Sequence, residues 1–251
     1  MRIIENLHYS ERENETDLMR LYLPECESFP VFVYFHGGGL ERGSLDSAAV
    51  LGPYLAEQGI ATLSINYRMY PDAKFPDFIV DGAKSLKWAK DNMSGYGEIK
   101  GIFAGGSSAG GYMSMMLCFD KRYLAAEGLA PTDIAGYVHD AGQPTTHFNV
   151  LRERGIDSRR VIVDEAAPLF FVGMEESYQP MTFIVSDNDM EARLEQTDLI
   201  LKTLSHFRYD ESKIIKHLMH GKHCAYVRAK DEEGNSVLGK IIEELITSCL
   251  G

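Results

Sequence analysis

The stretch Ile102-Phe103-Ala104-Gly105-Gly106-Ser107-Ser108-Ala109-Gly110-Gly111 decides the fold of this chain. Its apolar beginning continues a run with the composition of a buried strand, and a helix-like segment follows from about residue 108. A serine in such a sharp strand-to-helix turn, with glycine two positions before it and two after, is a nucleophile elbow. Ser107 fits this pattern less well, because Ala109 stands two positions after it. The flanking strand and helix therefore predict Ser108 as a nucleophile.

A glycine-rich turn before a helix has other uses, and the five-residue pattern alone often occurs by chance. The N-terminus of the helix can also hold a phosphate group. A phosphate-binding P-loop, however, ends in Gly-Lys-Ser/Thr, which is absent here. The surrounding strand and helix thus favour the nucleophile over the phosphate site.

Outward from this turn, apolar β-rich runs alternate with longer helix-like segments. This alternation is typical of an α/β fold, with a mostly parallel sheet covered by helices on both faces. The expected parallel strands cover residues 30–36, 60–66, 99–104, 134–139, 181–185 and 214–218. The expected helices cover residues 46–58, 77–92, 108–119, 191–206 and 235–248. Residues 16–23 alternate loosely and indicate an antiparallel edge strand.

The composition and the net charge argue against several classes of protein. The 251 residues show no repeat or linker, so a single α/β domain over residues 1–251 is expected. The net charge of −12 argues against a nucleic-acid partner, because such proteins usually carry a basic patch. The four cysteines are scattered, which indicates free thiols rather than disulfides or zinc. The polar N-terminus and the lack of a membrane-spanning apolar run lead us to expect a cytoplasmic protein.

A triple-glycine loop follows the first strong strand, in the sequence His36-Gly37-Gly38-Gly39. Acyl transfer builds negative charge on the carbonyl oxygen, so backbone N–H groups must point at that atom. Glycines allow the backbone to approach the substrate, and this loop supplies one half of the oxyanion hole in lipases and esterases. Gly38 and Ala109 are the expected donors, with Gly37 as a further candidate, and His36 is expected to brace the loop.

The catalytic acid and the catalytic base are expected after Ser108 in the sequence, because the order in this fold is serine, acid, histidine. Asp187 and Asp189 follow the strand at 181–185, at the sheet edge where such sites gather. Either aspartate would also suit a helix N-cap, and Asp189 is the preferred acid over Asp187. His223 is the preferred base over His220, because the loop between them gives the ring the reach to Ser108.

The downstream histidines allow two other interpretations. His217 lies within the last expected strand and is expected to face the sheet. His217, His220 and His223 follow one another at a spacing of three, which is reminiscent of a metal site. Gly221 and the strand-like flank argue against a helix here, so the three side chains are not expected to share one helical face. No metal is therefore expected.

These motifs resemble the α/β-hydrolase superfamily, especially the hormone-sensitive-lipase-like esterases. The chain is also similar to compact relatives near kynurenine formamidase and bacterial feruloyl or acetyl esterases. The resemblance spans residues 31–227 and implies the triad of Ser108, Asp189 and His223. It is carried by these motifs: the glycine loop from His36, Asn66-Tyr67-Arg68 with Pro71, the elbow, the Asp189 turn nine residues after Pro180, and His223-Cys224-Ala225-Tyr226.

Two features depart from the hormone-sensitive-lipase-like group. Ser107 stands where that group usually has aspartate, and only about thirty residues precede the first core strand, too few for its N-terminal helical cap. Any lid must therefore come from residues 141–179, between the fourth and fifth strands. Its aromatic residues are candidates for lining an acyl pocket, although two of them, Phe170 and Phe171, suit the core equally well. The four are Phe148, Phe170, Phe171 and Tyr178.

The leading functional hypothesis is hydrolysis of small esters with short or medium acyl groups through an acyl-enzyme. The resemblance makes carbohydrate acetyl or feruloyl esters candidate substrates, and the mechanism requires no metal or organic cofactor. Amide hydrolysis, by an arylformamidase or small peptidase, uses the same triad and stays open. A non-catalytic ligand receptor on the same scaffold also stays open, and the sequence does not indicate the oligomeric state.

Overall fold

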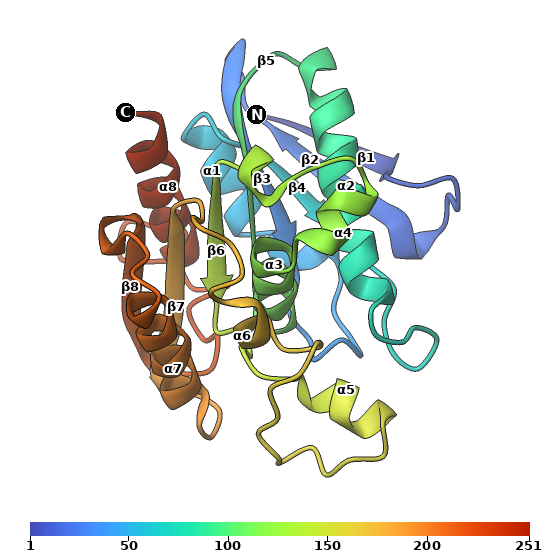
Figure 1. Cartoon of the computed structure of the whole chain (residues 1–251). Coiled ribbons are helices and arrows are strands. Elements are labelled where there is room, and N and C mark those ends of the chain that lie inside the picture. Colours follow the sequence, from blue (N-terminus) through green and yellow to red (C-terminus); the bar gives the residue numbers. More distant parts are fainter.

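The chain folds around one eight-stranded sheet with the strand order β1-β2-β4-β3-β5-β6-β7-β8 (Figure 1). The computed structural model describes residues 1–251. Strands β3 to β8 are parallel, and β1 and β2 are antiparallel to their neighbours. The bounds of the strands are β1 Arg2–His8, β2 Leu18–Leu23, β3 Ser28–Phe35, β4 Ala61–Ile65, β5 Glu98–Ser107, β6 Gly136–Asp140, β7 Met181–Asn188 and β8 Ile214–Lys222. The predicted mostly parallel α/β architecture is confirmed.

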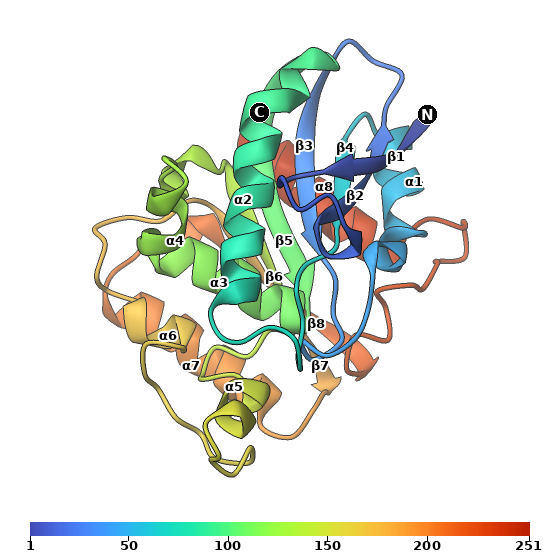
Figure 2. The same ribbon diagram turned by 90° about the vertical axis from the view of Figure 1, so that its right-hand side faces the viewer.

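Helices cover both faces of the sheet. Buried side chains of α2, α3 and α7 pack in one hydrophobic cluster, and those of α1 and α8 pack in a second. In Figure 2, α2 crosses in front of the strands and α8 lies behind them. The helices are α1 Leu51–Glu57, α2 Asp77–Asn92, α3 Ala109–Phe119, α4 Lys121–Ala126, α5 Phe148–Glu153, α6 Pro168–Phe171, α7 Arg193–His206 and α8 Val237–Leu250, with short 3₁₀ turns at Glu15–Asp17, Leu45–Ala48, Met93–Gly95, Pro131–Asp133 and Glu211–Lys213.

The continuous apolar run of β3 reflects this double cover. Val33 and Phe35 enter the cluster of α2 and α3, whereas Phe32 and Tyr34 enter the cluster of α1 and α8. Because successive side chains of a strand point to opposite faces, a strand covered on both faces is apolar throughout. The parallel strands run downward in Figure 1, so their carboxyl ends meet at the lower edge, where α5 lies.

The N-terminal part differs from the prediction. The predicted edge strand at 16–23 corresponds to β2, but β2 pairs on both sides, with β1 and with β4. The edge is β1, which the sequence analysis missed. Its residues are mostly exposed, and its polar side chains break the apolar alternation that marks a half-buried strand.

The predicted helix at 46–58 is also shorter than expected. A 3₁₀ turn occupies Leu45–Ala48, and α1 begins only at Leu51. Pro53 explains this start, because a proline lacks the N–H that a helix interior needs and is tolerated in the first turn. The expected stop at Gly59 is correct, since its φ of 78° suits glycine after a helix end.

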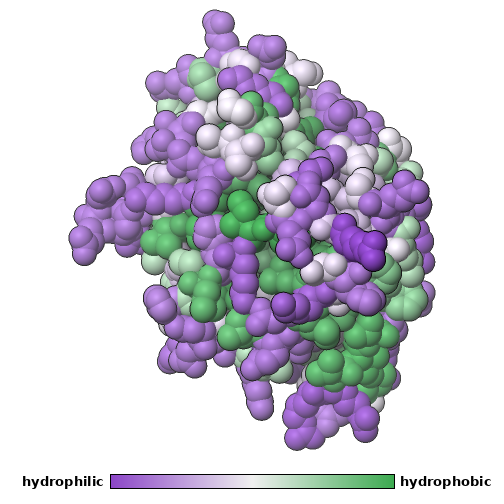
Figure 3. Space-filling model, turned by 60° about the vertical axis from the view of Figure 1, so that its left-hand side comes forward, coloured by the Kyte–Doolittle hydropathy of each residue, from purple (hydrophilic) through white to green (hydrophobic).

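The helices of the chain lack the length and apolar character needed to cross a membrane. Some large apolar side chains are nevertheless exposed on α7, on β8 and just after α7, namely Leu199, Leu218 and Phe207. Figure 3 brings this side forward and shows hydrophobic residues in separate patches among hydrophilic ones.

Candidate active site

Ser108 occupies a strained turn between β5 and α3. Its φ of 56° and ψ of −110° lie outside the regions that ordinary residues favour. Its N–H donates to the carbonyl oxygen of Asp140 at 2.7 Å, which ties the turn to the end of β6. A Cβ at Gly106 or Gly110 would overlap the carbonyl oxygen of Phe35, so both positions require glycine. The local geometry is therefore that of the predicted elbow.

The structure brings Ser108, His223 and Asp189 together. His223 Nδ1 lies 2.5 Å from Asp189 Oδ1, and His223 Nε2 lies 2.8 Å from Ser108 Oγ. A carboxylate only accepts hydrogen bonds, so Nδ1 carries the proton and the neutral ring leaves Nε2 free to accept the Ser108 proton. This is the chain of hydrogen bonds of a serine hydrolase triad.

The surroundings of Asp189 favour the ionised form of its carboxyl group. Its side chain is 1% exposed, and it accepts hydrogen bonds from the N–H groups of Ser186 at 3.2 Å and Met190 at 2.7 Å. Burial acts to raise the pKa of Asp189, but the hydrogen bond and charge of His223 and the two N–H groups outweigh it and hold that pKa below its usual value. A permanent carboxylate can then fix the tautomer and orientation of His223.

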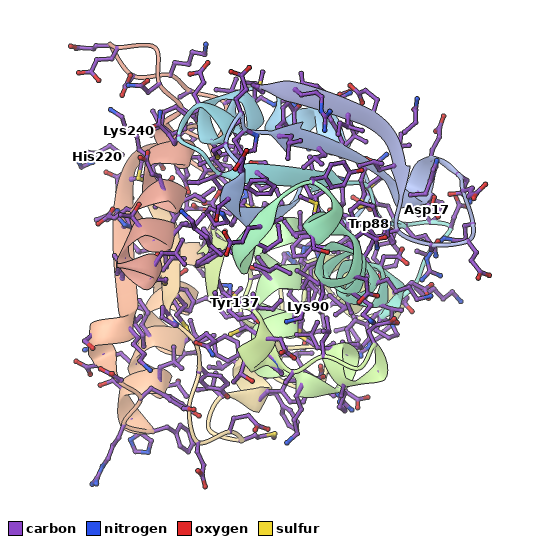
Figure 4. The ribbon with its side chains drawn as sticks, turned by 90° about the horizontal axis from the view of Figure 1, so that it is seen from above. Asp17, Trp88, Lys90, Tyr137, His220 and Lys240 are labelled. Atoms are coloured by element: carbon purple, nitrogen blue, oxygen red, sulfur yellow. The ribbon has the colours of Figure 1, made fainter.

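The two alternative residues form a separate pair on the surface. His220 Nδ1 lies 2.7 Å from Asp187 Oδ2, and the His220 side chain is 92% exposed. Figure 4 shows His220 outside β8, pointing away from the sheet. The prediction that His220 follows the last strand is wrong, because β8 continues to Lys222 and includes it. His217 lies in β8 as expected, with Nε2 3.5 Å from Glu244 Oε2.

The glycine loop lies beside Ser108 and presents free backbone donors. A Cβ on Gly37 would lie 3.3 Å from Ser108 Cβ, and Gly38 has a φ of 124° that favours glycine. No hydrogen bond in the structure uses the N–H of Gly37, Gly38 or Ala109. Ala109 is the first residue of α3, where N–H groups lack an intrahelical partner. These three donors are available to an oxyanion.

His36 braces the loop as expected. Its ring is buried and stacks on Tyr67 with ring centroids 4.3 Å apart, and Nδ1 donates to the Gly37 carbonyl oxygen at 2.7 Å. Tyr67 in turn donates its hydroxyl to the His36 carbonyl oxygen at 2.8 Å. Burial lowers the pKa of His36 to about 4, so the ring is neutral near pH 7.

A buried polar network beneath the triad was missed by the sequence analysis. Asp140 is 1% exposed, and its Oδ1 accepts a hydrogen bond from the hydroxyl of Tyr226. Tyr34 donates its hydroxyl to Ser107 Oγ at 3.0 Å, and Ser107 pairs with Asp140 in the β5–β6 register. Because Tyr226 comes three residues after His223, this network ties the histidine segment to the elbow.

Asp140 makes the stability of the protein depend on pH. Burial raises the pKa of Asp140 from 3.8 to about 6, and the hydroxyls of Ser107 and Tyr226 and the charge of His223 offset only part of that rise, to which Asp189 adds. The folded chain then binds this proton more tightly than the unfolded chain. The contribution of Asp140 to stability therefore falls as the pH rises from about 4 to about 6, and is constant above.

We expect Asp140→Asn, which cannot ionise but keeps an oxygen for Tyr226, to gain stability relative to the wild type over this window. The free energy of unfolding of Asp140→Asn, relative to that of the wild type, should increase by roughly 3 kcal/mol between pH 4 and pH 7, as measured by urea unfolding at several pH values. Asp72→Asn, at an exposed position, is the matched control. A difference between Asp140→Asn and wild type that does not change with pH would contradict the assignment.

A cavity of about 780 Å³ opens over Ser108 and His223. Of the four aromatic residues expected to line a pocket, only Phe148 of α5 borders this cavity. Phe171 and Tyr178 belong to the hydrophobic core, and Phe170 is 44% exposed. Within residues 141–179, α5 lies at the carboxyl edge of the sheet, whereas Gln179 at the end of the segment donates to the carbonyl oxygen of Thr132, which precedes β6.

Cys224 is a second nucleophilic side chain beside the histidine. Its Sγ lies 3.6 Å from His223 Nε2. Burial raises the pKa of the Cys224 thiol, and the charges of Asp140 and Asp189 raise it further. A neutral thiol is a weak nucleophile, so Ser108 remains the better candidate.

The family of the chain follows from its sequence. The sequence model of the BD-FAE family matches residues 19–151, which is just over half of the chain. The chain belongs to the BD-FAE family. The matched part of this BD-FAE protein contains the glycine loop and the elbow, whereas Asp189 and His223 lie beyond it.

Solved structures share the fold of this BD-FAE protein. Esterase B from Lactobacillus rhamnosis superposes with a TM-score of 0.80 at 19% identity, covering 99% of this chain and 85% of that chain. A hyperthermophilic esterase from Pyrobaculum calidifontis gives a TM-score of 0.74 at 18% identity, covering 100% of this chain and 84% of that one. The chain therefore has the α/β-hydrolase fold.

Curated relatives match over shorter stretches. The carboxylic ester hydrolase LipN of Mycobacterium tuberculosis is 33% identical over 108 residues, which are 42% of this chain and 29% of LipN. The probable carboxylesterase 7 of Arabidopsis thaliana is 31% identical over 139 residues, 48% of this chain and 42% of that protein. The chain thus spans less than half the length of either relative.

Proposed function

We propose that this BD-FAE protein is a serine hydrolase that cleaves carboxylic esters with short or medium acyl groups. The observation that carries the proposal is the hydrogen-bonded series Asp189–His223–Ser108, placed beside three unpartnered backbone N–H groups at the base of a cavity. The esterase names of the relatives and structural neighbours point the same way.

In the first half of the reaction, Ser108 Oγ attacks the ester carbonyl carbon while His223 Nε2 takes its proton. Asp189 stabilises the imidazolium that forms, and the N–H groups of Gly37, Gly38 and Ala109 stabilise the negative carbonyl oxygen. The carbon–oxygen bond to the alcohol then breaks, and His223 returns the proton to the departing alcohol.

In the second half, water attacks the ester formed on Ser108, with His223 again taking a proton. The intermediate collapses, releases the carboxylic acid and returns the proton to Ser108 Oγ. All proton transfers pass through His223 Nε2, which the structure holds 2.8 Å from Ser108 Oγ. No chemical group beyond the chain and water enters this sequence of steps.

We further propose that residues 1–251 act as one domain, with a small lid that lies within residues 141–179. The cavity of about 780 Å³ has the size of a site for a small molecule. Phe148 would contact the substrate from the lid, and the remaining aromatic residues of that segment would support it from the core and surface.

A series of 4-nitrophenyl esters from acetate to palmitate tests this proposal. We expect kcat/KM to be highest for the acyl chains of two to six carbons and to fall at least about tenfold for the longest. Folded protein that turns over none of these esters, but cleaves an aryl formamide such as N-formylkynurenine, would make it an amide hydrolase instead. Binding without turnover of either class would make it a receptor.

A further inference from the structure

Two arginines border the active-site cavity without partners in the protein. Arg42 follows the glycine loop, and Arg228 comes five residues after His223; both are exposed and line the cavity. Neither guanidinium takes part in any ion pair, side-chain hydrogen bond or cation–π contact of the structure. The third arginine of the cavity, Arg152, is already held by Asn149 Oδ1 at 2.8 Å and Glu41 Oε1 at 3.5 Å.

Both unpartnered arginines lie near the candidate catalytic residues. Arg42 Cγ lies 3.1 Å from where a Cβ of Gly38 would be, so its side chain packs against the candidate oxyanion loop. Burial raises the pKa of Tyr34, and the positive charge of Arg228 works against that rise. Tyr34 borders the cavity and hydrogen-bonds Ser107, so Arg228 lies within electrostatic reach of the cavity floor.

Three of the acidic side chains at the same sheet edge are already bound by histidine or arginine. Asp189 is bound to His223 and Asp187 to His220, and Glu41 is the only acidic residue among those that line the cavity. The residues that line the cavity thus include three arginines and one glutamate, in a chain whose net charge is −12. Since most of this acidic surface repels anions, a positive cavity is a local exception that favours an anionic ligand.

We propose that the substrate is an anionic ester, whose acyl or alcohol part carries a carboxylate or phosphate group that Arg42 and Arg228 bind. This inference rests on the proposed ester hydrolysis and specifies its substrate class. Guanidinium groups suit this role, because they donate several hydrogen bonds to carboxylate and phosphate oxygens. Arg42 and Arg228 would act on binding, and Ser108 on the chemistry.

Matched pairs of substrates measure the effect of the charge alone. 4-Acetoxyphenylacetate and 4-acetoxyphenylacetamide carry the same acetyl ester, and differ by a carboxylate against a neutral amide on the alcohol side. The mono(4-nitrophenyl) ester of adipic acid and its adipamide counterpart make the same comparison on the acyl side. The quantity compared is the ratio of kcat/KM for the anionic over the neutral member of each pair.

We expect wild-type protein to prefer the anionic member of at least one pair. Arg42→Gln and Arg228→Gln should each lower that ratio about threefold, and the double variant about tenfold, as for partly exposed ion pairs. Raising NaCl from about 0.05 M to about 0.5 M should lower the wild-type ratio and leave that of the double variant nearly constant. Arg208→Gln, at an exposed arginine between α7 and β8, at the opposite edge of the sheet, is the control and should not alter it.

The outcomes separate this inference from the proposed function. Turnover of the neutral esters with no anionic preference, or a preference that the double variant retains, overturns the inference and leaves ester hydrolysis standing. A folded wild-type protein that turns over no member of either pair overturns both.

Discussion

Replacing Ser108 by alanine is expected to lower kcat for a good ester substrate by about 10⁵- to 10⁶-fold. The hydroxyl is the proposed attacking group, and no other side chain near His223 can replace it, because the Cys224 thiol stays protonated. Alanine at a φ of 56° carries the same backbone cost as serine, so the fold should survive. The measurement is single-turnover and steady-state hydrolysis of 4-nitrophenyl acetate, together with a thermal unfolding curve.

Ser107→Ala is the control for this experiment. It removes a neighbouring hydroxyl and its 3.0 Å hydrogen bond from Tyr34, but leaves the Ser108–His223 contact in place. We expect a fall in kcat of less than about tenfold, since one neutral hydrogen bond is worth about 1 kcal/mol. Comparable losses in the two variants, or substantial activity in a folded Ser108→Ala, would refute the assignment of the nucleophile.

The second large effect is expected at the base and the acid. His223→Ala removes the only proton acceptor in contact with Ser108 Oγ and should lower kcat by about 10⁵- to 10⁶-fold. Asp189→Asn keeps the shape but loses the charge that fixes the His223 tautomer, and should cost about 10⁴-fold. The losses should not add in the double variant, because the residues act as one unit.

The chain contains its own control for this pair. His220 and Asp187 form the same kind of contact, at 2.7 Å, on the exposed side of β8. His220→Ala and Asp187→Asn should change kcat by less than about threefold, because neither side chain contacts Ser108 or His223. Large losses from the His220–Asp187 variants, with activity retained by the His223–Asp189 variants, would reverse the assignment.

The elbow and its surroundings were predictable because their signals are local. A buried strand, a turn that needs glycine and a helix follow one another between Glu98 and Phe119, and β5 and α3 start and end close to the predicted limits. The glycine loop after β3 is equally local. Both depend on backbone conformations that few residues other than glycine adopt, which makes them visible in a single sequence.

The choice between the two aspartates and the two histidines was harder, because it depends on where β8 ends. The strand continues to Lys222, so the period of two turns His220 outward, and His223 comes after the strand in the turn that reaches Ser108. The apolar pattern at 214–218 fades before that point. The sequence therefore favoured Asp189 and His223 without excluding the other pair.

The contact between Asp140 and Tyr226 could not be predicted in this way. The two residues are 86 positions apart, and neither carries a local pattern. One available signal was that Asp140 stands at the carboxyl end of a parallel strand, next to the strand that carries the elbow. The edge strand β1 was missed for a related reason, since its pairing with β2 and not its composition holds it in place.

Covalent labelling of the folded protein with a fluorophosphonate tests most directly whether Ser108 is an activated nucleophile. The reagent forms a bond with the serine oxygen and loses fluoride, so intact-mass spectrometry counts the adducts and peptide mapping locates them. We predict a single adduct on Ser108, loss of ester hydrolysis in proportion to labelling, and no adduct after His223→Ala or after denaturation. Hydrolysis that continues in fully labelled protein, or an adduct on another residue that abolishes activity, would contradict the proposed site.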